Sequence, residues 1–250
     1  MTKHTIPKRY RMYKEITLSN ANKLKYFVNR HSTKEGTWGK LTLSEGNIKF
    51  VFMNGQDQEY TTHTLNLDHP EIIIPPAAWH KIQLTSDRPF SAKIQFYCAP
   101  HRFFEKKYHL AQVHHDLLYA YQLYVSKKET LRILDLGCGR GRNALFMAQA
   151  GHHVTAIDID DSKLDDIRPI IKEENLDNLT LIQADLSQKN SITHGPYDFV
   201  ISTMSLPFLP PKRIEGLIQE LQASTAIGGK HLFVFPIADN RYAYPISFTF

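Results

Sequence analysis

Long apolar runs are absent from this 250-residue sequence, in which no stretch approaches the roughly 18 apolar residues of a membrane-spanning helix. Residues 1–8 contain no apolar core like that of a secretory signal peptide. Cysteine is scarce, and the two that are present, Cys98 and Cys138, agree with a reducing compartment. These absences predict a cytoplasmic protein with two unrelated thiols and no membrane partner.

Blocks of lysine and arginine are also absent, although the net charge is +5. Residues 1–100 carry 14 lysines and arginines against 8 acidic residues, whereas the rest of the chain carries 16 against 17. The basic excess therefore belongs to the first part, which could attract anions. No basic stripe is interleaved with aromatic residues, so a nucleic-acid partner is not expected.

The sequence changes character near residue 100. Before that point, short β-type segments alternate with turn signals, which predicts a small all-β sandwich or barrel over residues 1–99. After it, strands and helices alternate, which predicts an α/β domain with a parallel sheet over residues 100–250. The expected strands are 41–43, 48–52, 71–74, 81–84, 92–97, 132–136, 154–157, 179–183, 198–202 and 230–236, and the expected helices are 103–126, 142–150, 162–174 and 211–224.

A glycine-rich loop follows the strand at 132–136 directly. Glycines let the backbone turn sharply and lie against a ligand, and the helix that follows offers unpaired N–H groups. A dinucleotide fingerprint, G-x-G-x-x-G, would need a third glycine where Arg142 stands, which disfavours a nicotinamide oxidoreductase. The glycines instead fall at 137, 139 and 141 after Asp135, in the D-x-G-x-G-x-G form used for S-adenosylmethionine.

Two further carboxylates follow the next two strands. Asp158, with Ile159 after it, follows the second strand, where a carboxylate can accept both ribose hydroxyls. Asp185, with Leu186 after it, follows the third strand, where the adenine edge is expected. Each aspartate alone could equally be a helix cap or a turn former, and it is their spacing from the glycine loop that favours nucleoside binding.

The fourth strand ends at Ser202, and polar residues follow it. Ligands of open α/β sheets bind outside the carboxyl ends of the strands. Thr203 and Ser205 are therefore candidates to face the methyl donor or its acceptor, with ordinary loop hydroxyls as the alternative.

The second part of the chain resembles the class I, Rossmann-like methyltransferases, and more specifically the tellurite-resistance TehB-like methyltransferases. The resemblance rests on the stretches at 134–143, 174–179, 197–203 and 208–209 and on the lead-in at 104–108. It implies S-adenosylmethionine as cofactor and assigns functional residues at Tyr108, His114, Arg142 and Asn143. The full predicted cofactor set is Tyr108, Asp135, Gly137, Cys138, Gly139, Gly141, Arg142, Asn143, Asp158, Ile159, Asp185, Leu186, Ser202 and Thr203.

The first part resembles the cupin-like domain of the longer members of the same family, through residues 31–41 and 74–80. A class I sheet has seven strands, whereas five are expected here before Phe250, so the last strand pair is expected to be missing. That would leave the far edge of the sheet open and put the activity of this chain in question.

The 13 histidines suggest a metal, but a cupin metal site begins with an H-x-H pair and His31 is followed by Ser32 and Thr33. His31 and His80 could still converge with Glu35 or Glu71, although their spacing gives no support. Structural histidines are favoured, and no metal is predicted. His114, placed on the helix before the methyltransferase sheet, is the candidate catalytic histidine, with packing as its alternative.

Two functions follow as hypotheses. The first is methyl transfer from S-adenosylmethionine to tellurite-like or selenium oxyanions in detoxification, with His114, Thr203 and Ser205 as the catalytic candidates and a small oxyanion as the partner. The second is an S-adenosylmethionine-binding or anion-sensing protein without catalysis. The sequence leaves the oligomeric state open.

Overall fold

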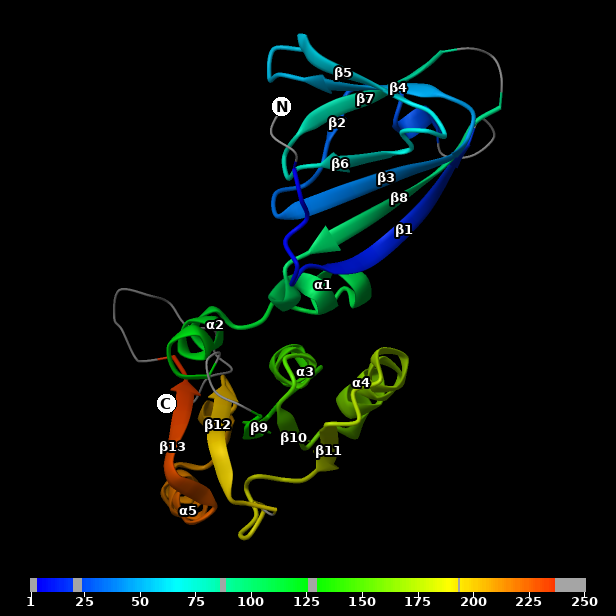
Figure 1. Cartoon of the computed structure of the whole chain (residues 1–250). Coiled ribbons are helices and arrows are strands. Elements are labelled where there is room, and N and C mark those ends of the chain that lie inside the picture. The colour runs from blue at the N-terminus through cyan, green and yellow to red at the C-terminus, as the bar shows by residue number, and fades with distance from the viewer. Residues whose placement is uncertain (1–3, 20–23, 86–88, 126–129, 193, 237–250) are drawn as a thin grey trace. The chain divides into compact units, whose positions relative to one another are not determined.

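The computed structural model describes residues 4–19, 24–85, 89–125, 130–192 and 194–236. The chain forms two compact units, Met1–Tyr108 and His109–Phe250, which are described separately below (Figure 1). None of the helices in the described residues is long and apolar enough to cross a membrane.

The first unit consists of two antiparallel four-stranded sheets, ordered β1-β8-β3-β6 and β2-β7-β4-β5, whose inner faces pack together (Figure 1). Its strands are β1 (Arg11–Ser19), β2 (His31–Ser32), β3 (Thr37–Glu45), β4 (Ile48–Met53), β5 (Glu59–Leu65), β6 (Glu71–Ile74), β7 (Trp79–Leu84) and β8 (Ser91–Cys98). The all-β architecture predicted from the turn spacing is confirmed.

Alternation along the strands builds the core between these sheets. In β3 every second residue from Thr37 to Leu43 is buried, and the intervening side chains face outward. Leu41 of one sheet and Phe50 of the other are both fully buried in the same cluster. The apolar, period-two strands were therefore recognisable from sequence, whereas β1 and β5 were not. Both are edge strands that pair on one side only and have a single buried residue each, so they lack the apolar alternation.

The predicted single helix over 103–126 is wrong. The short helices η1 (Leu24–Tyr26), η2 (Pro100–Arg102) and α1 (Phe103–Tyr108) belong to the first unit, and α2 (His115–Ala120) and the π-helical turn η3 (Tyr121–Val125) belong to the second. The backbone leaves the helix at His109, which has a left-handed φ of 58°, and it is still extended at His114. Leu110 and Val113 are buried from this non-helical segment, so their helix-like spacing was coincidental.

The second unit contains the predicted parallel sheet, in the order β11-β10-β9-β12-β13 (Figure 1). Its strands are β9 (Arg132–Leu136), β10 (His153–Asp158), β11 (Leu179–Gln183), β12 (Tyr197–Thr203) and β13 (Thr225–Val234), and its longer helices are α3 (Arg142–Gln149), α4 (Asp161–Glu174) and α5 (Pro211–Ala223), with the 3-10 turn η4 (Leu206–Phe208). The five strands expected from sequence are confirmed. The expected loss of a further strand pair concerns the chain after β13, where residues 237–250 lie outside the described part.

The central strand β9 positions the site. Four of its five residues are buried, because helices and neighbouring strands cover both faces of a parallel sheet. Leu217 and Leu221 of α5 pack in one cluster with Leu134 and Val200. The carboxyl ends of β9, β10 and β12 therefore lie next to one another at one edge of a rigid sheet, where the glycine loop begins.

Candidate cofactor site

The glycine loop, residues 137–141, leads from the end of β9 to the start of α3. Its three glycines have positive φ values of 65°, 56° and 76°, a region that other residues enter only with strain. The Cys138 N–H donates to the Ile157 carbonyl at 2.9 Å, and the Gly139 N–H donates to Asp158 Oδ2 at 2.7 Å. The loop is therefore anchored on β10, the neighbouring strand.

Each glycine of the loop meets a different environment. A Cβ on Gly137 would lie 2.3 Å from the Ser205 Cβ, and one on Gly141 would lie 2.8 Å from Ile167 Cδ1. A Cβ on Gly139 would meet nothing within 4 Å. The two ends of the loop are packed against protein, whereas its middle faces open space where a ligand can approach the backbone.

Asp158 is the buried carboxylate at the end of β10, with 6% of its surface exposed. Its two oxygens each accept one backbone N–H, from Gly139 at 2.7 Å and from Asp160 at 3.0 Å. Each carboxylate oxygen has two lone pairs, so both retain acceptor capacity. Ile159, the next residue, is 61% exposed and presents an apolar side chain beside these acceptors.

Asp185 lies two residues beyond the end of β11. It accepts hydrogen bonds from the backbone N–H and the hydroxyl of Ser187, and these bonds hold the pKa of its carboxyl below the ordinary value. Leu186 is buried in the core of the unit, so its backbone, rather than its side chain, is available to a ligand. Asp185 therefore does form a turn, as its alternative role predicted. The turn holds its charged carboxylate beyond the end of β11.

Asp135, on β9 before the loop, is the most unusual group of the site. Its side chain is 1% exposed and its Oδ2 has no hydrogen-bond partner. Burial raises the pKa of its carboxyl from 3.8 to about 7, against the opposing effects of Arg142 and of the Ala144 N–H. An orphaned buried acceptor has lost its solvation without compensation, so it is ready for a cationic or N–H-bearing ligand.

Asn143, the second residue of α3, joins two of the predicted functional residues. Its Oδ1 accepts the backbone N–H of His114 at 3.1 Å, and its Nδ2 donates to Thr203 Oγ1 at 3.0 Å. Asn143 is itself 2% exposed, which leaves its amide few other partners. The structure therefore brings His114, Asn143 and Thr203 together, although they come from three different elements.

Ser202 and Ser205 are placed differently from Thr203. The Ser205 hydroxyl donates to the Leu136 carbonyl at 2.8 Å, and the Ser202 hydroxyl lies 2.6 Å from it and must then be the donor of that pair. Ser202 is fully buried. Both hydroxyls are used inside the protein, where they fix the end of β12 against the glycine loop.

Three other predicted residues have distinct surroundings. Arg142 donates from Nη1 to the Gln112 carbonyl at 3.5 Å. The Cys138 thiol is 8% exposed, and burial raises its pKa, so it stays protonated. Tyr108 ends α1 in the first unit, where its ring stacks on Phe104 with centroids 6.0 Å apart.

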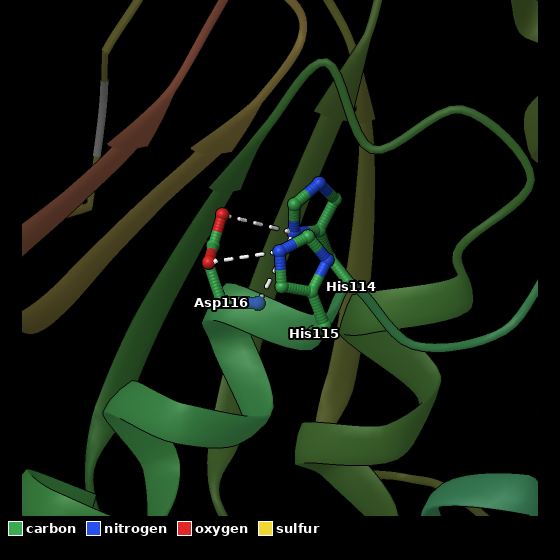
Figure 2. Close-up of side chains that lie close together, drawn as sticks. All are labelled: His114, His115 and Asp116. Carbon is green, nitrogen blue, oxygen red and sulfur yellow. Dashed lines mark hydrogen bonds and ion pairs between the residues drawn. The ribbon is translucent and has the colours of Figure 1, made fainter.

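His114 caps the N-terminus of α2, and its side chain lies close to those of His115 and Asp116, as Figure 2 shows. Its Nδ1 accepts the Asp116 N–H at 3.3 Å, and its ring stacks on His115 with centroids 4.8 Å apart. Burial, followed by the Arg142 charge, holds the pKa of His114 below 6.5, so the ring is neutral near pH 7 with its proton on Nε2. His114, His115 and Asp116 could gather around a metal ion, but the Nδ1 lone pair of His114 is already used by the helix cap.

Comparison with known proteins identifies the family. Residues 96–250 match the family described as "Tellurite resistance protein TehB", and residues 16–91 match the "TehB-like domain". The chain belongs to the TehB family. The first match includes the glycine loop and all three aspartates, and the second lies within the two-sheet unit.

Relatives from the TehB family cover nearly all of the chain. The "Probable S-adenosyl-L-methionine-dependent methyltransferase TehB" of Haemophilus influenzae strain 10810 is 31% identical over 239 residues, which are 95% of this chain and 81% of the relative. The crystal structure of TehB from Haemophilus influenzae superposes with a TM-score of 0.87 at 29% identity and covers 97% of this chain and 82% of that one. "Hemagglutinin 1" of Eikenella corrodens is 32% identical over 191 residues, 75% of this chain and 61% of the relative. This TehB-family chain is thus an S-adenosylmethionine-dependent methyltransferase.

The structure connects several of the predicted site residues in ways that the sequence did not show. The link from His114 through Asn143 to Thr203 joins residues that are 29 and 60 positions apart, so no local pattern reveals it. Ser187 was missed, although Asp-x-Ser after a strand is a recognisable turn signal.

Proposed function

We propose that this chain transfers the methyl group of S-adenosylmethionine to a small oxyanion of tellurium or selenium. Two observations support binding of the cofactor: the middle of the glycine loop faces open space, and Asp135 Oδ2 has no hydrogen-bond partner. The choice of acceptor rests on the family, whose description names tellurite resistance. We also propose the finer fold assignment, a cupin-like barrel over 1–99 and a class I methyltransferase domain over 100–250. The facing antiparallel sheets and the strand order of the parallel sheet support it.

The residues present fit the cofactor. Asp158 would accept the ribose hydroxyls with the lone pairs that its two backbone donors leave unused. Asp135 would take the ammonium group of the methionine part, which supplies the partner that its Oδ2 lacks. Ile159 and Asp185 would hold the adenine, by apolar contact and by hydrogen bonding respectively.

The chemistry needs little from the protein beyond alignment. When bound, the cofactor supplies a methyl group on a positively charged sulfur, and a tellurium(IV) or selenium(IV) centre has a lone pair that can take it. Transfer would form a bond from that centre to the methyl carbon and break the sulfur–carbon bond, so the products would be the methylated oxyanion and S-adenosylhomocysteine. A soft nucleophile of this kind requires no general base, so the residues contribute mainly orientation and exclusion of water.

The oxyanion would be held by two hydrogen-bond donors. Thr203 Oγ1 accepts from Asn143, which leaves its own proton to donate. The neutral His114 ring has its proton on Nε2, because Nδ1 accepts from Asp116. Ser205, predicted as catalytic, would act instead by fixing the loop, since its hydroxyl already donates to Leu136.

The raised pKa of Asp135 predicts how pH affects the cofactor-free protein. The folded-state pKa of about 7 exceeds the ordinary 3.8, so this group stabilises the fold fully below about pH 4 and loses that contribution as pH rises to about 7. Asp135→Asn should therefore raise the free energy of unfolding at pH 8 by up to about 4 kcal/mol, and by less at pH 5. Chemical denaturation of both proteins at pH 5 and pH 8 measures the difference.

The affinity for the cofactor product should increase with pH, whereas the stability of the cofactor-free protein decreases. S-adenosylhomocysteine keeps the ammonium group, so its affinity for the wild type should increase as Asp135 ionises near pH 7, and Asp135→Asn should remove that dependence. A pH-independent affinity in the wild type would contradict the assigned partner of Asp135.

The function is tested by incubating the full chain with S-adenosylmethionine and either selenite or tellurite. We expect S-adenosylhomocysteine to form together with an equal amount of the methylated selenium or tellurium oxyanion. His114→Gln should lower kcat by about a hundredfold, as loss of a preorganised donor does, whereas the exposed neighbour His115→Gln should stay within about twofold. Turnover with organic acceptors alone would refute the oxyanion substrate, and cofactor binding without turnover on any acceptor would favour the non-catalytic hypothesis.

A further inference from the structure

Two histidines of the first unit lie side by side in its interior. His31 of β2 and His80 of β7 are directly paired across the strands, with ring centroids 4.2 Å apart. His80 is 1% exposed and occupies an inward position of β7, next to the inward Ile82. Two imidazole rings therefore occupy interior positions that apolar side chains could fill equally well for the stability of the fold.

The backbone fixes the tautomer of both rings. His31 Nδ1 is bonded to the Asn29 carbonyl at 2.9 Å, and His80 Nδ1 is bonded to the Ala78 carbonyl at 2.8 Å. A carbonyl only accepts, so each Nδ1 carries the proton and each Nε2 has the lone pair. His31 Nε2 is buried without a hydrogen-bond partner. Burial lowers the pKa of both rings, that of His80 to about 4, so both are neutral acceptors at pH 7.

These acceptors border a cavity of about 200 Å³ between the two sheets. Its walls combine apolar side chains such as Phe27 and Phe96 with the buried hydroxyl residues Thr33 and Thr37, and the exposed residues Lys14 and Lys34 also line it. Among the described residues that line it, none carries a carboxylate. The cavity therefore offers neutral nitrogen acceptors together with positive charge.

We propose that this cavity binds a small oxoacid anion that retains an O–H group at neutral pH. The single O–H would be shared between the two histidine Nε2 acceptors, and the negative charge would be balanced by Lys14 and Lys34. Two imidazoles could also hold a metal cation, but two lysines and no described carboxylate disfavour a doubly charged one. The site lies wholly in the first unit and is distinct from the cofactor site of the second.

Selenite and selenate provide a matched pair of probes, because hydrogen selenite has an O–H at neutral pH and selenate has none. The choice of selenite as the probe rests on the proposed function. The site itself is inferred from the cavity and its two histidines and does not depend on that function. With the full chain labelled with ¹⁵N at histidine, selenite should shift the Nε2 resonances of His31 and His80 at about millimolar concentration, and selenate should leave them unchanged.

Variants sharpen the test. His80→Gln and His31→Gln should each weaken selenite binding about tenfold, as loss of one buried acceptor does, whereas the exposed His69→Gln should change it by less than about twofold. The resonances of the unchanged histidines of the first unit should keep their wild-type positions in all three variants, which verifies that this unit folds. Asp158→Ala should lose the cofactor yet keep these shifts, so failure of the methyltransferase proposal remains distinguishable.

The site proposal is overturned if selenite leaves both Nε2 resonances unmoved. It is also overturned if selenate shifts them equally, since charge alone would then account for binding. Shifts produced by Zn²⁺ but not by selenite would likewise overturn it in favour of a metal site.

Discussion

Asp158→Ala is expected to weaken binding of S-adenosylhomocysteine at least about a hundredfold. The ribose would lose two hydrogen bonds to a charged acceptor, each contributing about 1.5 kcal/mol or more. The substitution also removes the acceptor of the Gly139 N–H, so the middle of the glycine loop loses its anchor on β10. Calorimetric titration of the variant and the wild type gives the ratio of the two affinities.

Asp160→Ala is the matched control for that experiment. Asp160 belongs to the same segment, but its carboxylate caps α4 by accepting hydrogen bonds from the Ser162 N–H and hydroxyl. We assign it no contact with the ligand. Its loss should cost about 1 kcal/mol of stability and little affinity. Equal weakening in both variants would show that Asp158 acts through the general stability of the segment, which contradicts direct ribose binding.

Gly137→Ala and Gly139→Ala should separate packing from ligand approach within a single loop. Both positions have positive φ, which costs an alanine about 1 kcal/mol. At Gly137 the added Cβ would also lie 2.3 Å from the Ser205 Cβ, an atom that cannot move without its backbone, so the destabilisation should reach about 3 kcal/mol or more. At Gly139 the space is open, and only the strain should be measured.

The affinity of the two glycine variants for S-adenosylhomocysteine should not follow their stability. Gly139→Ala should fold almost normally and still bind S-adenosylhomocysteine at least about tenfold more weakly, because its methyl group enters the space left for the ligand. Denaturation curves and titrations of the same samples measure both quantities. Wild-type affinity in Gly139→Ala would show that the ligand does not lie against the middle of the loop.

The parallel sheet and its loop were predictable because their signals are local. A buried parallel strand is a short continuous apolar run, and β9 passes directly into glycines whose spacing distinguishes two classes of cofactor. Asp158 and Asp185 follow from the same reasoning, since Asp158 is the last residue of β10 and Asp185 comes two residues after β11.

Other features depend on contacts that no local pattern contains. The helical spacing of Leu110, Val113 and Leu117 was misleading, because a buried loop also needs apolar residues. The His31–His80 pair depends on the register of β2 against β7, which joins residues 49 positions apart. The role of Ser205 depends on where β12 ends relative to β9, and hence on the whole sheet.

A crystal structure of this chain with S-adenosylhomocysteine tests the central claim most directly. We predict that the ribose hydroxyls of the ligand lie within hydrogen-bond distance of Asp158. The ligand should also pass the open side of Gly139, and its ammonium group should contact Asp135 Oδ2. Density for the nucleoside elsewhere, or an Asp135 oxygen that remains without a partner in the complex, would contradict the account.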